Sequence, residues 1–76
     1  MKKMLDAVIR EICFYQNITK KKLQSLGRKN EELYITRYAI KILYKYGYTS
    51  IRLIGRVLSK NHATIHYHLK KMKLKK

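Results

Sequence analysis

A short stretch near the C-terminus, NHATIHYHLKKM (residues 61–72), holds most of the side chains in this sequence that are suited to chemistry. It contains all three histidines of the chain, together with an asparagine, a threonine and a tyrosine. Imidazoles in such a cluster can bind a metal ion or move protons. The same hydrogen-bonding groups can also read the edges of bases in DNA.

The histidine spacing is compatible with a metal pair, but the rest of a metal site is missing from the sequence. His62 and His66 are four residues apart and would share a helix face, with His68 close by. A zinc ion needs three or four protein ligands, and no Glu or Cys lies near these positions. With only four acidic residues in the chain, no catalytic triad or carboxylate pair is available. We therefore expect no enzyme activity, no metal or other cofactor, and no small-molecule substrate.

The same stretch fits a DNA-reading helix better. If Ile65, Leu69 and Met72 face inward, the opposite face begins with short hydrogen-bonding groups and ends in an aromatic ring and two lysines. That face would consist of His62, Ala63, Thr64, His66, Tyr67, Lys70 and Lys71. Reading helices contact base edges from their first residues and phosphates around them, so the gradient predicts a recognition helix over 62–73. A merely solvated polar face is the alternative.

The charge of the chain points in the same direction. Nineteen Lys and Arg against four Asp and Glu give a formal net charge of +15 in only 76 residues. A single small domain with this charge repels itself, and a polyanionic partner relieves the repulsion. Nucleic acid is the first expectation for that partner, and an anionic membrane surface is the second.

The remaining composition suggests a cytoplasmic protein. The single cysteine, Cys13, cannot form an internal disulfide and is expected to act as a small core hydrophobe. Uncharged runs are too short for a membrane span, and the charged start MKKMLDAVIREI is unlike a signal peptide. The basic ends MKKML and KLKK suggest a free-standing protein, of phage or mobile-element origin, whose oligomeric state stays open.

Helical periodicity without any sustained alternation predicts an all-α fold. A first helix is expected over residues 3–16, and a second one is capped by Thr19, buries Leu23 and Leu26, and ends at Gly27. The sequence GRKN (27–30) would then form a basic loop.

Three further helices are expected after this loop. Asn30 would cap the longest one, which Gly47 ends, and its apolar face would consist of Leu33, Ile35, Ala39, Ile42, Leu43 and Tyr46. Thr49 and Ser50 would cap a helix in which Ile51, Ile54, Gly55 and Leu58 share a face. Asn61 would then start the last helix. The whole chain (1–76) is predicted to be one compact bundle of about five helices with a helix-turn-helix at about 50–73.

Two motifs in this region resemble a known family. SIRLIG (50–55) followed by NHATI (61–65) is similar to the signature S-L-x-E-I-G … G-R-D-H-T/S-T-V of the C-terminal DNA-binding domain of the bacterial replication initiator DnaA. GRKN falls where that family has its basic loop, and RYAI (37–40) where it has R-Q-I-A-M. FY (14–15), Ile18 and Leu23 look like its entry helices, so the similarity covers about residues 8–73.

The resemblance implies a helix-turn-helix fold of the DnaA C-terminal or Trp-repressor type and assigns roles by position. His62 and Thr64 match the family's base-contacting His and second Thr, and Arg28 matches the loop Arg that enters the minor groove. Asn61 replaces an Asp and Ala63 the first Thr, and the turn is about one residue shorter. Asp accepts from cytosine whereas Asn pairs with adenine, so a different recognition sequence is expected. No phosphate-binding G-x-x-x-x-G-K-[ST] motif is present, so the chain would be the DNA-reading module alone.

The sequence thus predicts a double-stranded DNA-binding protein with sequence preference, acting in transcriptional control, replication or DNA packaging of a bacterial or phage element. The residues expected in the major groove are Asn61, His62, Ala63, Thr64, His66 and Tyr67. Those expected at the minor groove or phosphates are Arg28, Lys29, Thr49, Ser50, Lys60, Lys70 and Lys71. The alternatives are non-specific coating of DNA or RNA and, less favoured, binding to a membrane surface. The tyrosines around the long helix (34, 38, 44, 46, 48) are interpreted as core and rim rather than as stacking platforms for single strands.

Overall fold

The computed structural model describes residues 4–27 and 29–72, and every regular element in these ranges is a helix. The elements are α1 (Leu5–Gln16), α2 (Lys20–Leu23), α3 (Asn30–Lys45), α4 (Ile51–Leu58) and α5 (His62–Met72). The predicted all-α fold with five helices is confirmed. The first helix begins at Leu5, with Met4 in extended conformation before it, so the predicted start at residue 3 was too early.

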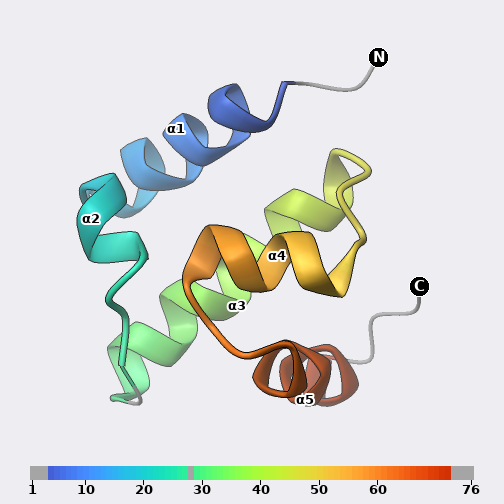
Figure 1. The fold of residues 1–76 in the computed structure, drawn as a ribbon. Coiled ribbons are helices and arrows are strands. Elements are labelled where there is room, and N and C mark those ends of the chain that lie inside the picture. Colours follow the sequence, from blue (N-terminus) through green and yellow to red (C-terminus); the bar gives the residue numbers. More distant parts are fainter. Residues whose placement is uncertain (1–3, 28, 73–76) are drawn as a thin grey trace.

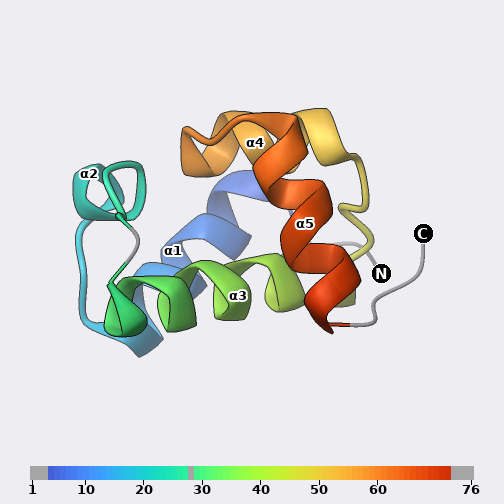
Figure 2. The same ribbon diagram turned by 90° about the horizontal axis from the view of Figure 1, so that it is seen from below.

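The longest helix, α3, is the element against which the others assemble (Figures 1 and 2). It contacts α1, α4 and α5, while the short α2 contacts α1. The tightest helix pair is α4 with α5, and in Figure 2 α5 stands at a steep angle to α3. The last two helices thus form one unit that packs against α3.

The core is aliphatic and draws on all five helices. Its fully buried members include Val8, Ile12, Leu23, Leu26, Ala39, Ile40, Leu43, Ile54, Leu58 and Ile65. Four of the five tyrosines interpreted as core or rim pack half-buried against this cluster, whereas Tyr34 is exposed. The predicted burial of Leu23 and Leu26 is confirmed.

The buried face of α3 is rotated slightly from the one predicted. Ala39 and Leu43 are buried as expected, but Thr36 and Ile40 complete the face. Four expected members, Leu33, Ile35, Ile42 and Tyr46, are only half-buried. A threonine fits this interior because its hydroxyl donates to the Glu32 carbonyl one turn earlier, at 3.0 Å, so no polar group is left unsatisfied.

Two of the predicted helix caps are confirmed. The Lys22 N–H donates to the Thr19 hydroxyl (3.1 Å), and the Leu53 N–H donates to the Ser50 hydroxyl (3.3 Å). Of the pair proposed for α4, Ser50 is therefore the cap and Thr49 is not. Gly47 follows the end of α3 with φ 89°, a conformation that glycine adopts without strain.

Two other predictions around the basic loop are wrong. Helix α2 ends at Leu23, four residues before Gly27, and Asn30 is already the first helical residue of α3, with Lys29 at the cap position. Instead the Gly27 N–H donates to the Glu32 carboxylate (2.8 Å), which folds the loop back onto the first turn of α3. This hydrogen bond, followed by the nearby Lys22 ammonium, lowers the pKa of Glu32.

Within residues 4–27 and 29–72, none of the helices is both long enough and apolar enough to cross a membrane.

Candidate nucleic-acid interface

The junction between α4 and α5 is a tight three-residue turn, as predicted. Ser59 ends α4 in the left-handed conformation (φ 55°), and the Lys60 N–H donates to the Gly55 carbonyl at 2.8 Å. Asn61 then caps α5, because its side-chain carbonyl accepts from the Ala63 N–H at 2.8 Å. These bonds satisfy backbone groups that a helix end would otherwise leave without partners.

Gly55 permits the two helices to approach this closely. A Cβ at this position would lie 2.8 Å from the backbone carbonyl oxygen of Lys60, closer than folded proteins tolerate. It would also lie 3.8 Å from the side chain of Ile65 on α5. The glycine of the SIRLIG motif is therefore a packing requirement of the helix-turn-helix.

The inward face of α5 holds the helix against α3 and α4. Ile65 and Leu69 are buried and Met72 is half-buried, in agreement with the predicted face. His68 is also buried, at 3% exposure, which the sequence prediction missed. The signal was present, since residue 68 is three positions after Ile65 and one helical turn before Met72. His68 had been assigned to neither face of the helix.

Every predicted base-contacting residue is exposed. The exposed residues of the 61–71 segment are Asn61, His62, Ala63, Thr64, His66, Tyr67, Lys70 and Lys71. At 100° per residue around the helix, Ala63 and Tyr67 lie at the centre of this face, directly opposite Ile65. Thr64 and Lys71 lie on one flank, and His62 and His66 lie on the other. His62 and Thr64, which were expected to contact bases together, therefore lie on opposite edges of this face.

The Thr64 flank faces α3. Leu33 of α3 and Ala63, Thr64, Tyr67 and His68 of α5 line a hollow of about 430 Å³. The Lys71 ammonium lies 5.8 Å from the centre of the Tyr67 ring, a cation–π contact that orients both side chains along the outer face. The exposed face of α5 thus combines a shallow apolar depression with hydrogen-bonding and cationic groups.

A lysine joins the start of α5 to the basic loop. The Lys60 ammonium donates to the carbonyl of Leu26, so it holds the loop beside the turn that precedes α5. Lys60 is half-buried and is used within the fold, unlike the freely exposed phosphate contact that the sequence suggested. Lys29 is exposed at the start of α3. The predicted minor-groove residue Arg28 lies outside the described residues.

The two residues before α4 lie away from this junction. Ser50 is exposed and Thr49 half-buried, at the opposite end of α4 from the turn. An eight-residue helix is about 12 Å long, so these hydroxyls are separated from Lys60 by that distance along the axis. The Ser50 hydroxyl accepts the Leu53 N–H as the helix cap and keeps its own O–H as a donor.

The buried His68 is held neutral by its surroundings. Desolvation, followed by the positive charges of Arg37 and Lys60, lowers the pKa of its imidazole. Its Nδ1 atom has no hydrogen-bond partner among the described residues. Because His68 faces the core while His62 and His66 face solvent, the three imidazoles do not converge. In the described part of the chain, no group of three or more His, Cys, Asp or Glu side chains is arranged to hold a metal ion.

Comparison of the chain with protein-family models, with curated proteins and with solved structures gave no match.

Proposed function

We propose that this protein binds double-stranded DNA with sequence preference, and that it does so by laying α5 in the major groove. The observation that carries the proposal is the exposed face of α5, where hydrogen-bonding and cationic side chains stand out from a helix whose opposite face is fixed in the core. A single α-helix fits the major groove of B-DNA, where all four base pairs can be distinguished.

The division of roles follows from the position of each side chain. Ala63 and Tyr67 at the centre would make apolar contacts with thymine methyl groups, and Thr64 and His62 would make hydrogen bonds on either side. Lys70 and Lys71, about two turns further along, are placed for phosphates. Lys60 holds Leu26 beside the turn that precedes α5, and the exposed Lys29 would contact the adjacent DNA backbone. The minor-groove role of Arg28 is implied by the resemblance alone.

These features support assignment to the same class as the C-terminal DNA-binding domain of DnaA, as a reading module without an ATPase. A cytoplasmic role in transcriptional control, replication or packaging of a bacterial or phage element fits this class. Because Asn61 replaces the family's Asp, a recognition sequence that includes adenine at the corresponding position is expected.

Selection of bound duplexes from a random pool tests the proposal. We expect enrichment of a defined sequence of a few base pairs next to an A/T-rich stretch. The high positive charge also supports a second function, non-specific coating of nucleic acid. That function would give strong binding without enrichment, which would overturn the sequence-preferring assignment.

A further inference from the structure

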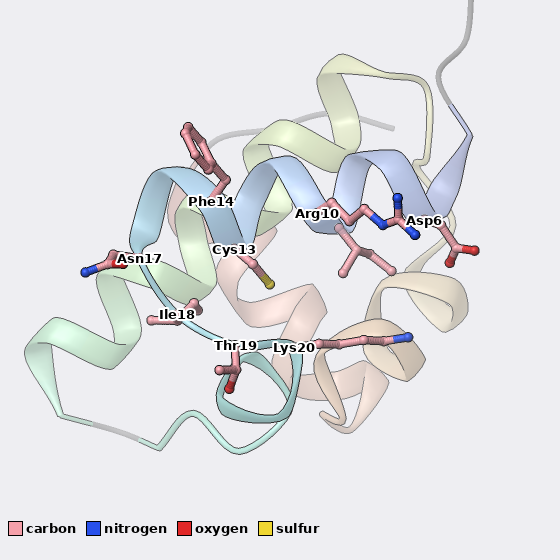
Figure 3. Close-up of a pocket in the computed structure, with 9 residues that line it drawn as sticks. Asp6, Arg10, Cys13, Phe14, Asn17, Ile18, Thr19 and Lys20 are labelled. Atoms are coloured by element: carbon pink, nitrogen blue, oxygen red, sulfur yellow. The ribbon is translucent and has the colours of Figure 1, made fainter.

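A groove of about 700 Å³ lies between α1 and the start of α2 (Figure 3). It is lined by Asp6, Ile9, Arg10, Cys13, Phe14, Asn17, Ile18, Thr19 and Lys20. Figure 2 shows α2 and α5 at opposite sides of the molecule, so this groove is separate from the proposed DNA-reading face. The proposed function does not use any residue that lines it.

The groove has an apolar floor and cationic sides. Cys13 points from α1 towards the Thr19–Lys20 segment, and the long side chains of Arg10 and Lys20 extend from α1 and from the start of α2 (Figure 3). Ile9 also lines the groove. Cys13 is half-buried, not fully in the core as the sequence suggested, and burial raises the pKa of its thiol. Neither Arg10 nor Lys20 forms an ion pair in the described part of the chain. The Arg10 guanidinium extends along α1 towards Asp6, whereas the Lys20 ammonium lies away from that carboxylate (Figure 3).

One exposed aromatic ring, that of Phe14, lies at the rim of the groove. Phe14 is 78% exposed and packs edge-to-face on Tyr15, itself 66% exposed, with ring centres 5.4 Å apart. The fold does not need either ring, since α1 is anchored by Val8, Ile9 and Ile12. Phe14 lines the groove and Tyr15 does not, and an exposed aromatic ring at the edge of a groove with an apolar floor is typical of a binding surface.

The net charge of the protein limits which ligand can bind in this groove. A second copy of this chain carries the same +15 charge and would be repelled. A flat membrane surface would reach the Phe14 rim but not the floor formed by Ile9 and Cys13. A ligand that fills the floor and complements the rim must be narrow, apolar on one side and acidic on the other.

We propose that the α1–α2 groove docks an acidic amphipathic helix of a partner protein. Its apolar stripe would contact Ile9, Cys13 and Phe14, and its carboxylates would meet Arg10 and Lys20, with the exposed Lys21 and Lys22 adding long-range attraction. Asp6 lies at one end of the groove and disfavours an acidic residue there. The acidic residues of the partner should therefore cluster at the end that lies over Lys20. If the protein binds DNA as proposed, the partner would be recruited to that DNA, because the α1–α2 groove stays open when α5 lies in the major groove.

Selection from a library of random 16-residue peptides displayed on phage tests this proposal. The full-length protein is used as bait, first free and then saturated with a DNA duplex. Phe14→Ala and Lys20→Glu are the test variants, and both positions are exposed, so folding is preserved. Tyr34→Ala, which removes an aromatic ring of similar exposure from α3, is the matched control. Affinities of the enriched peptides are measured by fluorescence anisotropy, and their binding site is located by amide chemical-shift changes.

We expect enriched peptides with apolar residues at i, i+3, i+4 and i+7 and acidic residues between them. Their affinity should fall at least about tenfold in Phe14→Ala and Lys20→Glu, stay unchanged in Tyr34→Ala, and persist with DNA bound. Three results would overturn the proposal. The first is that no peptide is enriched, and the second is that the enriched peptides bind wild type and Phe14→Ala equally well. The third is that the amide chemical-shift changes fall on α5 instead of on the α1–α2 groove. Phe14-dependent binding of anionic vesicles or single-stranded DNA without peptide binding would assign the groove to those ligands. None of these results depends on sequence-preferring DNA binding.

Discussion

Gly55→Ala is the substitution whose effect follows most directly from the structure. The added methyl group would lie 2.8 Å from the Lys60 carbonyl oxygen, well inside van der Waals contact. That oxygen belongs to the turn backbone, which the Lys60 N–H to Gly55 carbonyl bond (2.8 Å) holds in place. The clash can therefore be relieved only by moving the turn or opening α4 away from α5.

Two opposing contributions set the change in the free energy of unfolding for Gly55→Ala. Alanine is favoured over glycine inside a helix by about 1 kcal/mol, whereas overpacking of a fixed interior typically costs about 1–3 kcal/mol. With a backbone atom as the obstacle, the upper part of that range applies. We therefore expect a net loss of about 1–2 kcal/mol in the free energy of unfolding. For a domain of this size, each kcal/mol corresponds to about 4–8 °C in Tm.

Urea denaturation followed by circular dichroism measures the effect, with Gly27→Ala as the matched control. At Gly27 the nearest heavy atom to an added Cβ is a Glu32 carboxylate oxygen at 3.4 Å, an ordinary contact with a mobile side chain. Gly27→Ala should therefore be close to neutral. If Gly55→Ala were as stable as wild type or more so, α4 and α5 would not approach as closely as described.

The remaining predictions concern electrostatics, backbone strain and pH. If about five to eight phosphates are contacted, log affinity for duplex DNA should fall against log salt with a slope of about −5 to −7, and an affinity insensitive to salt would exclude the phosphate contacts. Ser59→Gly should stabilise the protein by about 0.5–1 kcal/mol, because a non-glycine residue now occupies a left-handed position (φ 55°); Ser59→Ala should give no such gain in Tm. Since burial lowers the pKa of His68 below its usual 6.5, the unfolded chain takes up a proton more readily than the folded one. Stability should therefore be complete above pH 6.5 and decrease as the pH falls below it. His68→Gln should flatten the pH dependence of the free energy of unfolding below pH 6.5, measured by urea denaturation. The exposed-site control His62→Gln should leave this dependence unchanged. An equally steep dependence in His68→Gln would refute the assignment.

Much of the fold was predictable because helical periodicity and capping are local. Thr19 and Ser50 cap through hydrogen bonds to residues three positions on, which the sequence displays directly. The SKN turn and the inward Ile65 and Leu69 followed from the same reasoning. These features depend on neighbours within one helical turn.

The errors arose where contacts that reach beyond one helical turn override local preference. Asn30 is a good cap by residue type, but the loop is fixed by the Gly27–Glu32 hydrogen bond and α3 starts one residue earlier. Likewise, Lys60 was treated as a surface charge because nothing local indicates that its ammonium reaches the Leu26 carbonyl, 34 residues away in sequence. The exposed Phe14 and the groove beside it were also invisible in the periodicity, since they depend on how α2 packs against α1.

The most direct test of the DNA-reading assignment is the ratio of affinities for a selected duplex and a scrambled duplex, measured in folded Thr64→Ala and Lys71→Ala. Thr64→Ala keeps the helix and removes one hydroxyl from the flank of the α5 face. Its affinity for the selected site should drop by about 1–3 kcal/mol, with little change for the scrambled one. Lys71→Ala should weaken both duplexes about equally and leave the ratio intact. A ratio that stays at the wild-type value in Thr64→Ala, and also in His62→Ala, would contradict the proposal that α5 reads bases.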